Sequence, residues 1–96
     1  ILGGVHAQGL PETCANEDCF DFVIPGEGEI TFYKLIRALE NGTDIDQIGG
    51  IYFKKNGVVK NPGPGELVEN LDDLPFPARH LIRQENYQEQ IILLGL

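Results

Sequence analysis

The sequence contains no serine, methionine or tryptophan, only two cysteines, and just seven basic residues among its 96. The absence of serine excludes a Ser/His/Asp catalytic triad. Fifteen acidic residues bring the net charge to -8, so the surface is unsuited to neutralising a nucleic-acid backbone and would be repelled by anionic membranes. No run of about 18 apolar residues could span a bilayer, and no segment resembles a signal peptide. We therefore expect neither a nucleic-acid partner nor a membrane span.

The two cysteines, Cys14 and Cys19, are too few for a disulfide scaffold or for a four-ligand zinc or iron–sulfur site. We expect two reduced thiols of a cytoplasmic protein. A hydrophobic content of 42% and a charged content of 23% are ordinary for a globular domain. The apolar ends, Ile1-Leu2 and Ile91 to Leu96, lead us to expect that both ends are cuts through a longer polypeptide.

The first part of the chain alternates strands and helices. Ile1-Leu2 is interpreted as the end of a strand that runs into a glycine-rich loop, Gly3 to Ala7. Pro11 favours the first turn of a short helix, and the β-branched and aromatic run Phe20 to Ile24 predicts a second strand. Because only a short helix separates the two strands, we expect them to be parallel neighbours in an α/β sheet.

A longer helix is predicted from about Glu29 to Asn41, ended by Gly42. Its apolar side chains recur at helical spacing, which predicts one buried face. That face comprises Phe32, Leu35, Ile36 and Leu39.

The remainder predicts a hairpin and a linker. Asn56-Gly57 between two apolar runs is a strong hairpin signal, and the prolines and glycines of 61–65 indicate a loop. The proline-containing stretch Leu71 to Pro77 is expected to be extended, and a helical or irregular tail follows.

Two glycine-rich loops follow the two predicted strands. Ligands of open parallel sheets bind beyond the carboxyl ends of the strands, so both loops would lie on the same rim. Glu27 and Glu29 disfavour a phosphate there, and no lysine completes a G-x-x-x-x-G-K pattern. A neutral or mixed ligand fits better, although Gly26 and Gly28 could equally form no more than a tight turn.

Other polar residues carry weaker signals. His6 could move a proton or bind a metal, but no second ligand stands at suitable spacing, and a loop histidine with one hydrogen bond is the simpler interpretation. Asp72-Asp73 could suggest a metal-binding or acid/base pair. Neighbouring side chains of an extended segment point to opposite faces, which favours a solvated turn.

Taken together, the order and spacing of these segments resemble the cobalamin-binding class of radical S-adenosylmethionine enzymes, from residue 1 to about residue 82. This class includes methyltransferases and oxidative cyclases such as the anaerobic magnesium-protoporphyrin IX monomethyl ester cyclase. The segments that carry the resemblance are Gly3-Gly4-Val5-His6-Ala7, Leu10-Pro11-Glu12, Asp21-Phe22-Val23, Gly26-Glu27-Gly28-Glu29, Gly49-Gly50-Ile51-Tyr52, Asn56-Gly57 and Leu71 to Pro77.

The resemblance implies a flavodoxin-like, Rossmann-like, doubly wound parallel sheet, of which this chain supplies part. Residues 1–48 would be the second half of a cobalamin-binding domain, 49–70 a β-hairpin extension, and 71–96 a linker toward a radical barrel. That barrel would hold a [4Fe-4S] cluster and S-adenosylmethionine on a cysteine triad absent from this chain. The implied cobalamin-binding residues are Gly3, Gly4, Val5, His6, Ala7, Gly26, Glu27, Gly28 and Glu29.

Two alternatives stay open: a nucleotide- or flavin-binding half-domain, and a non-catalytic α/β interaction module whose glycines only make turns. Removal of the preceding strands would leave the first strand of this fragment with an exposed edge, and such an edge favours pairing with a second chain. We therefore also expect a homodimer through that edge.

Overall fold

The computed structural model describes residues 1–83 and residue 85 of the chain. The expected C-terminal tail beyond Pro77 is described only up to Arg83 and at Glu85, and the apolar run from Ile91 lies outside the described residues. The helices are α1 (Val5–Gly9), α2 (Pro11–Asn16) and α3 (Glu29–Asn41), the strands are β1 (Phe22–Val23), β2 (Tyr52–Lys55) and β3 (Val58–Lys60), and two 3-10 turns follow, η1 (Leu71–Asp73) and η2 (Arg79–Leu81).

The three strands form an antiparallel sheet in the order β1-β2-β3. Leu2 adds a parallel bridge to Val23 at the outer side of β1. Its N–H donates to the Phe22 carbonyl at 2.9 Å, and its carbonyl accepts from the Ile24 N–H at 2.8 Å. The predicted parallel pairing of the first two segments is therefore confirmed, within a small α/β fold.

A flavodoxin-like parallel sheet, which the resemblance implied, is not what the described residues form. After α3, the segment 43–50 returns alongside the helix, and its residues Ile45 and Ile48 pack against the core. The chain therefore reaches Gly49 and Gly50 beside Thr31, in the first turn of α3. From that end it enters β2 antiparallel to β1, where a continued crossover would have given a parallel strand.

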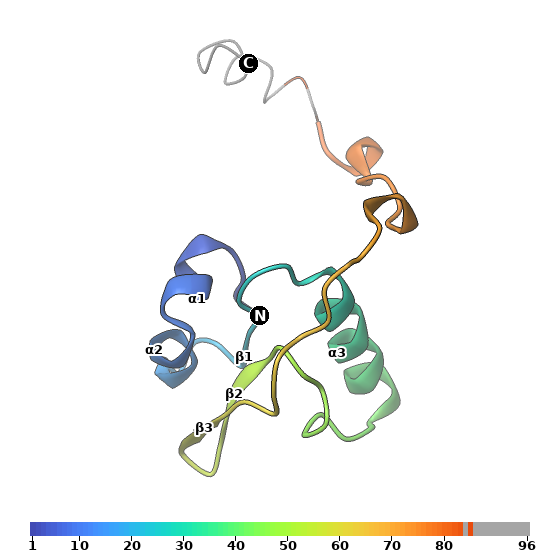
Figure 1. Cartoon of the computed structure of the whole chain (residues 1–96). Coiled ribbons are helices and arrows are strands. Elements are labelled where there is room, and N and C mark those ends of the chain that lie inside the picture. The colour runs from blue at the N-terminus through green and yellow to red at the C-terminus, as the bar shows by residue number, and fades with distance from the viewer. Residues whose placement is uncertain (84, 86–96) are drawn as a thin grey trace.

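Helices cover both faces of the sheet, with α1 and α2 on one side and α3 on the other (Figure 1). The alternation of side chains along the strands produces two core clusters. Val23 packs with Ala7, Cys14 and Ala15 beneath the first two helices. On the opposite face the second cluster contains Ile24, Leu35, Ile51 and Phe53.

The prediction of a loop over Gly3 to Ala7 is wrong from Val5 onward, because Val5 begins α1. Gly4, with φ of 94°, makes the turn into this helix. Ala7 is fully buried in the first core cluster, and its burial holds α1 onto the sheet. The predicted helix at Pro11 is confirmed as α2.

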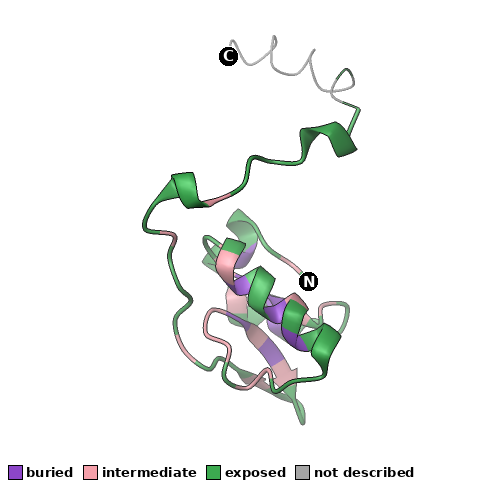
Figure 2. Cartoon of the chain, turned by 90° about the vertical axis from the view of Figure 1, so that its right-hand side faces the viewer, coloured by how far each residue is buried: buried purple, intermediate pink, exposed green. Residues whose placement is uncertain are grey.

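The bounds of α3 and its left-handed end at Gly42 (φ 64°) are confirmed. The predicted buried face is partly wrong. Phe32 and Leu39 are 49% and 47% exposed, whereas the buried side chains of α3 are Thr31, Leu35 and Ala38 (Figure 2). Thr31 lies against Gly49, Gly50 and Gly65, a contact with distant parts of the chain that an apolar pattern does not register.

The hairpin is confirmed: Asn56 (φ 54°) and Gly57 (φ 77°) form its two-residue turn. The stretch from Leu71 is not extended throughout, because Leu71–Asp73 form η1. The Asn70 side chain accepts a hydrogen bond from the Asp72 N–H at 3.1 Å and so starts this turn. Beyond it, the chain leaves the body as an exposed arm (Figures 1 and 2).

Three further observations concern the cysteines, membrane-spanning helices and metal ligands. Cys14 is buried and Cys19 exposed, and both are free thiols. No helix within residues 1–83 is long and apolar enough to cross a membrane. Among these described residues, no group of three or more His, Cys, Asp or Glu side chains is arranged to hold a metal ion.

Candidate functional site

Two glycine-bearing strand exits lie side by side at one end of the sheet. The parallel bridge between Leu2 and Val23 aligns the two segments, so Gly3-Gly4 and the turn after Ile24 leave the sheet at the same end. Between them lies a groove of about 410 Å³, here called the glycine groove. It is lined by Ile1, Leu2, Gly3, Gly4, Ile24, Gly26, Gly28, Glu29 and Phe32.

The glycines give this groove a floor of bare backbone. Gly4 (φ 94°) and Gly26 (φ 72°) have the left-handed geometry that side chains disfavour, and the space where each Cβ would stand is open. A Cβ at Gly28 would stand 2.9 Å from the Ile24 Cγ2 atom, so a larger residue here would force the buried Ile24 side chain to shift. At Gly3 a Cβ would meet only the Ile24 carbonyl oxygen, at an ordinary 3.7 Å.

The remaining predicted site residues lie outside the glycine groove. Val5 is 88% exposed and His6 is also exposed, both on α1. Ala7 has no exposed surface at all. Glu27 lines an adjoining groove, described next. The structure therefore brings together Gly3, Gly4, Gly26, Gly28 and Glu29, and their role in binding stays a prediction.

A second groove of about 400 Å³ begins on the other side of the turn Pro25–Gly28 and shares Gly26 with the first. Its far wall is the segment 61–67, here called the proline–glycine loop. No sequence motif predicted a ligand role for this loop. This groove, here called the loop groove, is lined by Pro25, Gly26, Glu27, Thr31, Gly50, Tyr52, Asn61, Gly63, Pro64, Gly65, Glu66 and Leu67.

Close backbone packing holds the proline–glycine loop in place. The Gly50 N–H donates to the Gly63 carbonyl at 2.8 Å. A Cβ at Gly49 would overlap the Pro64 carbonyl oxygen, and one at Gly50 would stand 2.8 Å from the Gly65 Cα. The glycine pairs of both segments could have signalled this approach, because backbones meet so closely only where Cβ atoms are missing.

Two side chains reinforce the same loop. The Thr31 hydroxyl, on α3, donates to the Gly49 carbonyl at 3.4 Å. Lys34, one turn further along α3, forms an ion pair with Glu66 in the loop. The loop is thus attached to α3 and to the start of β2 by contacts that do not require a ligand.

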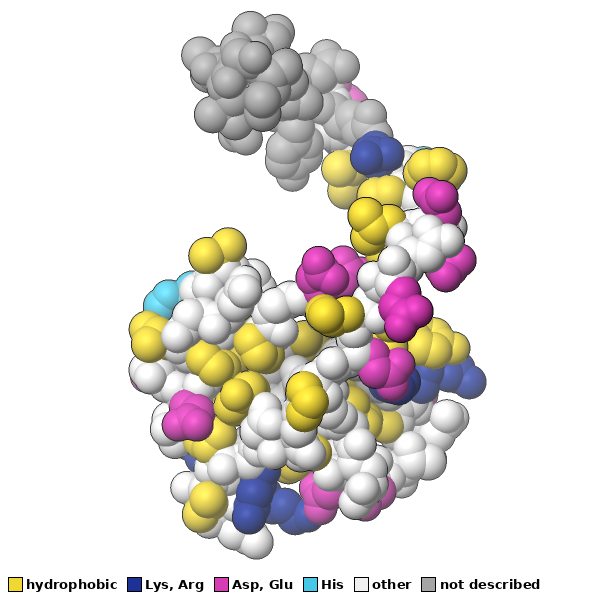
Figure 3. Space-filling model, in the orientation of Figure 1, with side chains coloured by type: hydrophobic (Ala, Val, Ile, Leu, Met, Phe, Trp, Pro, Cys, Tyr) yellow, Lys and Arg dark blue, Asp and Glu magenta, His cyan; other side chains and the backbone are white. Residues whose placement is uncertain are grey.

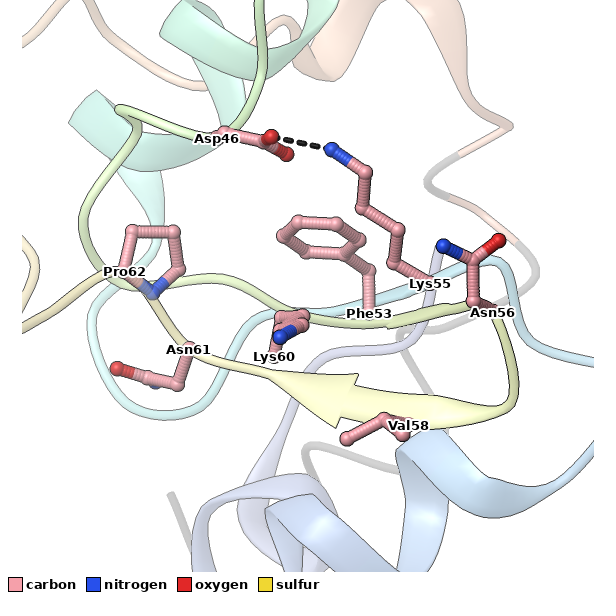
Figure 4. Close-up of a pocket in the computed structure, with 8 residues that line it drawn as sticks. All are labelled: Asp46, Phe53, Lys55, Asn56, Val58, Lys60, Asn61 and Pro62. Atoms are coloured by element: carbon pink, nitrogen blue, oxygen red, sulfur yellow. Dashed lines mark hydrogen bonds and ion pairs between the residues drawn. The ribbon is translucent and has the colours of Figure 1, made fainter.

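Two further hollows adjoin these grooves, one sharing Asn61 with the loop groove and the other sharing Glu29 with the glycine groove. One of about 430 Å³ borders the hairpin, where Lys55 reaches across the Phe53 ring to pair with Asp46 (Figure 4). The Asp46 carboxylate, mainly through its hydrogen bond, raises the pKa of Lys55. The other, of about 710 Å³, is largely apolar and lies between Ile30 and Tyr33 of α3 and the arm at 71–77. Acidic side chains gather near the point where this arm leaves the body (Figure 3).

The chain resembles curated proteins along most of its length. An uncharacterized methyltransferase of Pyrococcus horikoshii is 36% identical over 97 residues, which cover 100% of this chain and 21% of that protein. The anaerobic magnesium-protoporphyrin IX monomethyl ester cyclase of Synechocystis is 39% identical over 73 residues, 75% of this chain and 15% of the cyclase. A cytidylyl-2-hydroxyethylphosphonate methyltransferase of Streptomyces wedmorensis is 29% identical over 109 residues, 92% of this chain and 20% of that enzyme.

These homologues are thus methyltransferases and a cyclase. The chain spans about a fifth of their length or less. No family model matches the chain, and no solved structure matches it. The comparisons therefore associate the chain with methyl-transferring and ring-forming enzymes through one limited region of each.

Proposed function

We propose that this chain is part of a cobalamin-dependent radical S-adenosylmethionine enzyme, of methyltransferase or oxidative cyclase type, and supplies part of its cobalamin-binding rim. The observation that carries the proposal is the glycine groove: two adjacent strand exits present bare backbone at one end of the sheet. The names of the homologues support the same reaction classes. Residues 1–48 would belong to the cobalamin domain, 49–70 to its hairpin extension, and 71–96 to a linker.

The residues of the groove fit a bulky, largely neutral cofactor. The open space above Gly4 and Gly26 lets a ligand approach the backbone without meeting a Cβ. Leu2, Ile24 and Phe32 supply apolar contact, and Glu29 is the one charged side chain of the lining. Such a mixture suits a neutral or amide-bearing ligand better than a bare phosphate, which Glu29 would repel.

When bound, cobalamin would supply the cobalt chemistry of methyl transfer or cyclisation, while an iron–sulfur cluster and S-adenosylmethionine held elsewhere in the polypeptide would supply the radical. The residues of this chain would bind and orient the cofactor. The backbone of Gly3 and Gly4 would contact its nucleotide tail, and the turn at Gly26 to Glu29 would form the next wall. Val5, His6 and Ala7 are also proposed to lie near this nucleotide tail. We further propose that the protein is cytoplasmic.

The test uses the polypeptide that carries this chain, purified without oxygen and reconstituted with iron, sulfide and hydroxocobalamin. We expect corrin absorbance bands to accompany the protein. Gly3→Val should weaken cobalamin binding by at least about tenfold, because the new side chain fills the groove while its Cβ makes only an ordinary contact.

Gly9→Val is the matched control, since Gly9 lies at the end of α1 and a Cβ there meets open space. It should leave cobalamin binding unchanged. Iron–sulfur absorbance without corrin bands would keep a radical enzyme but remove cobalamin from these loops. Equal binding by both variants would show that the glycine groove does not hold the cofactor.

A further inference from the structure

We infer that the proline–glycine loop, residues 61–67, is a preformed second wall of the same ligand site, and that the loop groove receives neutral hydrogen-bond donors of the ligand, such as carboxamides, and rejects anions. This inference rests on the proposed function and adds residues and a chemical preference to it. The two grooves meet at Gly26, so a ligand wide enough to cross the turn Pro25–Gly28 would contact both.

The loop is ordered by contacts that do not involve a ligand. The Gly50 N–H bonds to the Gly63 carbonyl, and the buried Thr31 side chain lies against Gly65, 2.9 Å from where a Cβ would stand. Lys34 ties the last part of the loop to α3 through Glu66. Because the wall is already held in place, a ligand would not have to order it on binding, and this lowers the entropic cost of association.

The charges of the loop groove determine what it accepts. Its lining contains two carboxylates, Glu27 and Glu66, and no lysine, arginine or histidine. Glu66 is neutralised by Lys34. Within residues 1–83, no ion pair involves Glu27, which leaves a negatively charged acceptor on the turn between the two grooves. A carboxamide N–H₂ would donate to this carboxylate, whereas a carboxylate or phosphate would be repelled.

The amide groups at the edge of the corrin ring allow a direct test of the preference for neutral donors. Cobalamin monocarboxylic acids differ from cobalamin in one peripheral amide, which is hydrolysed to a carboxylate. We expect hydroxocobalamin to bind the anaerobically purified polypeptide, and at least one monocarboxylic acid to bind about tenfold or more weakly, because its carboxylate would face Glu27. Glu27→Gln should remove most of this discrimination, and its exposed position makes the exchange tolerable to the fold.

The wall itself is tested by a matched pair of exposed leucines. Leu67, 70% exposed, lines the loop groove, whereas Leu81, 76% exposed, lies on η2 and lines neither groove. We expect Leu67→Asp to weaken hydroxocobalamin binding by about tenfold and Leu81→Asp to change it less than about twofold. A circular dichroism spectrum and a melting curve establish that both variants fold.

The outcomes separate the two proposals. If hydroxocobalamin does not bind the unaltered polypeptide, the proposed function fails and this inference fails with it. If hydroxocobalamin binds but all monocarboxylic acids bind equally well, or Glu27→Gln leaves their discrimination unchanged, the proposed function stands and the preference for neutral donors is overturned. Equal effects of Leu67→Asp and Leu81→Asp would overturn the assignment of the wall.

Discussion

The buried hydroxyl of Thr31 donates a hydrogen bond to the Gly49 carbonyl oxygen at 3.4 Å, across 18 residues of sequence. This bond joins the first turn of α3 to the point where the chain enters β2. It lies behind the loop groove, of which Thr31 and Gly50 are both part. The geometry of the rim therefore depends on a contact that lies within the fold.

Replacement of Thr31 by valine should lower the free energy of unfolding by about 1–2 kcal/mol, because the shape is kept while the Gly49 carbonyl loses its donor. Urea unfolding of the purified protein measures this change. Thr13→Val is the control, since Thr13 is an exposed residue of α2. Equal losses in the two variants would show that the Thr31 hydroxyl has no specific role.

The contact between Gly50 and Gly65 predicts a severe effect of a single methyl group. Gly50→Ala combines a φ of 86° with a Cβ 2.8 Å from the Gly65 Cα, and we expect a loss of at least about 2–3 kcal/mol from strain and overlap together. Gly42→Ala introduces the same methyl at φ 64° in open space, and should cost only about 1 kcal/mol from conformation alone. Thermal unfolding compares them, and similar losses would show that the close approach is unimportant.

The different burial of Leu35 and Leu39 on α3 predicts different losses of stability when each is replaced by alanine. Leu35 is fully buried, and Leu35→Ala should destabilise the protein by about 2–5 kcal/mol through lost burial and a residual cavity. Leu39 is 47% exposed, so Leu39→Ala should cost less than about 1 kcal/mol. Chemical denaturation measures both. Equal losses would restore the face that the sequence pattern predicted, which contains both leucines.

The ion pair between Lys54 and Asp18 predicts how the Asp18 carboxyl titrates. The Lys54 ammonium donates to the Asp18 carboxylate at 2.7 Å, and this hydrogen bond, with the lysine's charge, lowers the pKa of Asp18. Its small stabilising effect is present above the ordinary aspartate pKa and is lost as the pH falls through the lowered value. Lys54→Met should raise the titration midpoint of the Asp18 carboxyl in NMR spectra.

Lys55→Met is the matched control for that titration. Lys55 pairs with Asp46, and its own pKa is raised by that hydrogen bond, so its contribution is present at lower pH and is lost as the pH rises through the raised pKa. Removal of Lys55 should leave the Asp18 midpoint where it is. A shift of Asp18 in the control would contradict the pairwise assignment.

The edge formed by Leu2 predicts self-association of the chain when it is produced alone. Leu2 pairs with Val23 on one side, and no described segment pairs with its other side. Such an edge is a template for a second chain, and we propose a homodimer through it. Light scattering measures the mass in solution, and a monodisperse monomer would count against the proposal.

Local signals in the sequence were sufficient for several elements. Pro11, Gly42 and Asn56-Gly57 are start, stop and turn residues whose backbone preferences act over a few positions, and the structure confirms α2, the end of α3 and the hairpin. The parallel pairing of Leu2 with Val23 also followed from the short connection between them. Of the proposed site, the glycines of both strand exits could be named in advance because their conformational freedom is a local property.

Other features depended on distant parts of the chain. The buried face of α3 contains Thr31, Leu35 and Ala38. Thr31 is buried because Gly49 and Gly50, which are distant in sequence, lie against it, and hydrophobicity along one helix does not contain that information. The turn at Leu71–Asp73 arises from an Asn70 side-chain bond that competes with an extended backbone. The burial of Ala7 in the core likewise became visible only once α1 was placed.

The acidic character of the chain, its helix and hairpin signals and the two glycine-rich exits can be read from the amino-acid order alone, since each is a property of composition or of neighbouring residues. The antiparallel direction of β2 relative to β1, and the position of the proline–glycine loop beside Glu27, follow only from long-range packing. Both result from packing of the segment 43–50 and the loop 61–67 against the first turns of α3. Such contacts join residues far apart in the chain, and their energies exist only when the backbone brings them together.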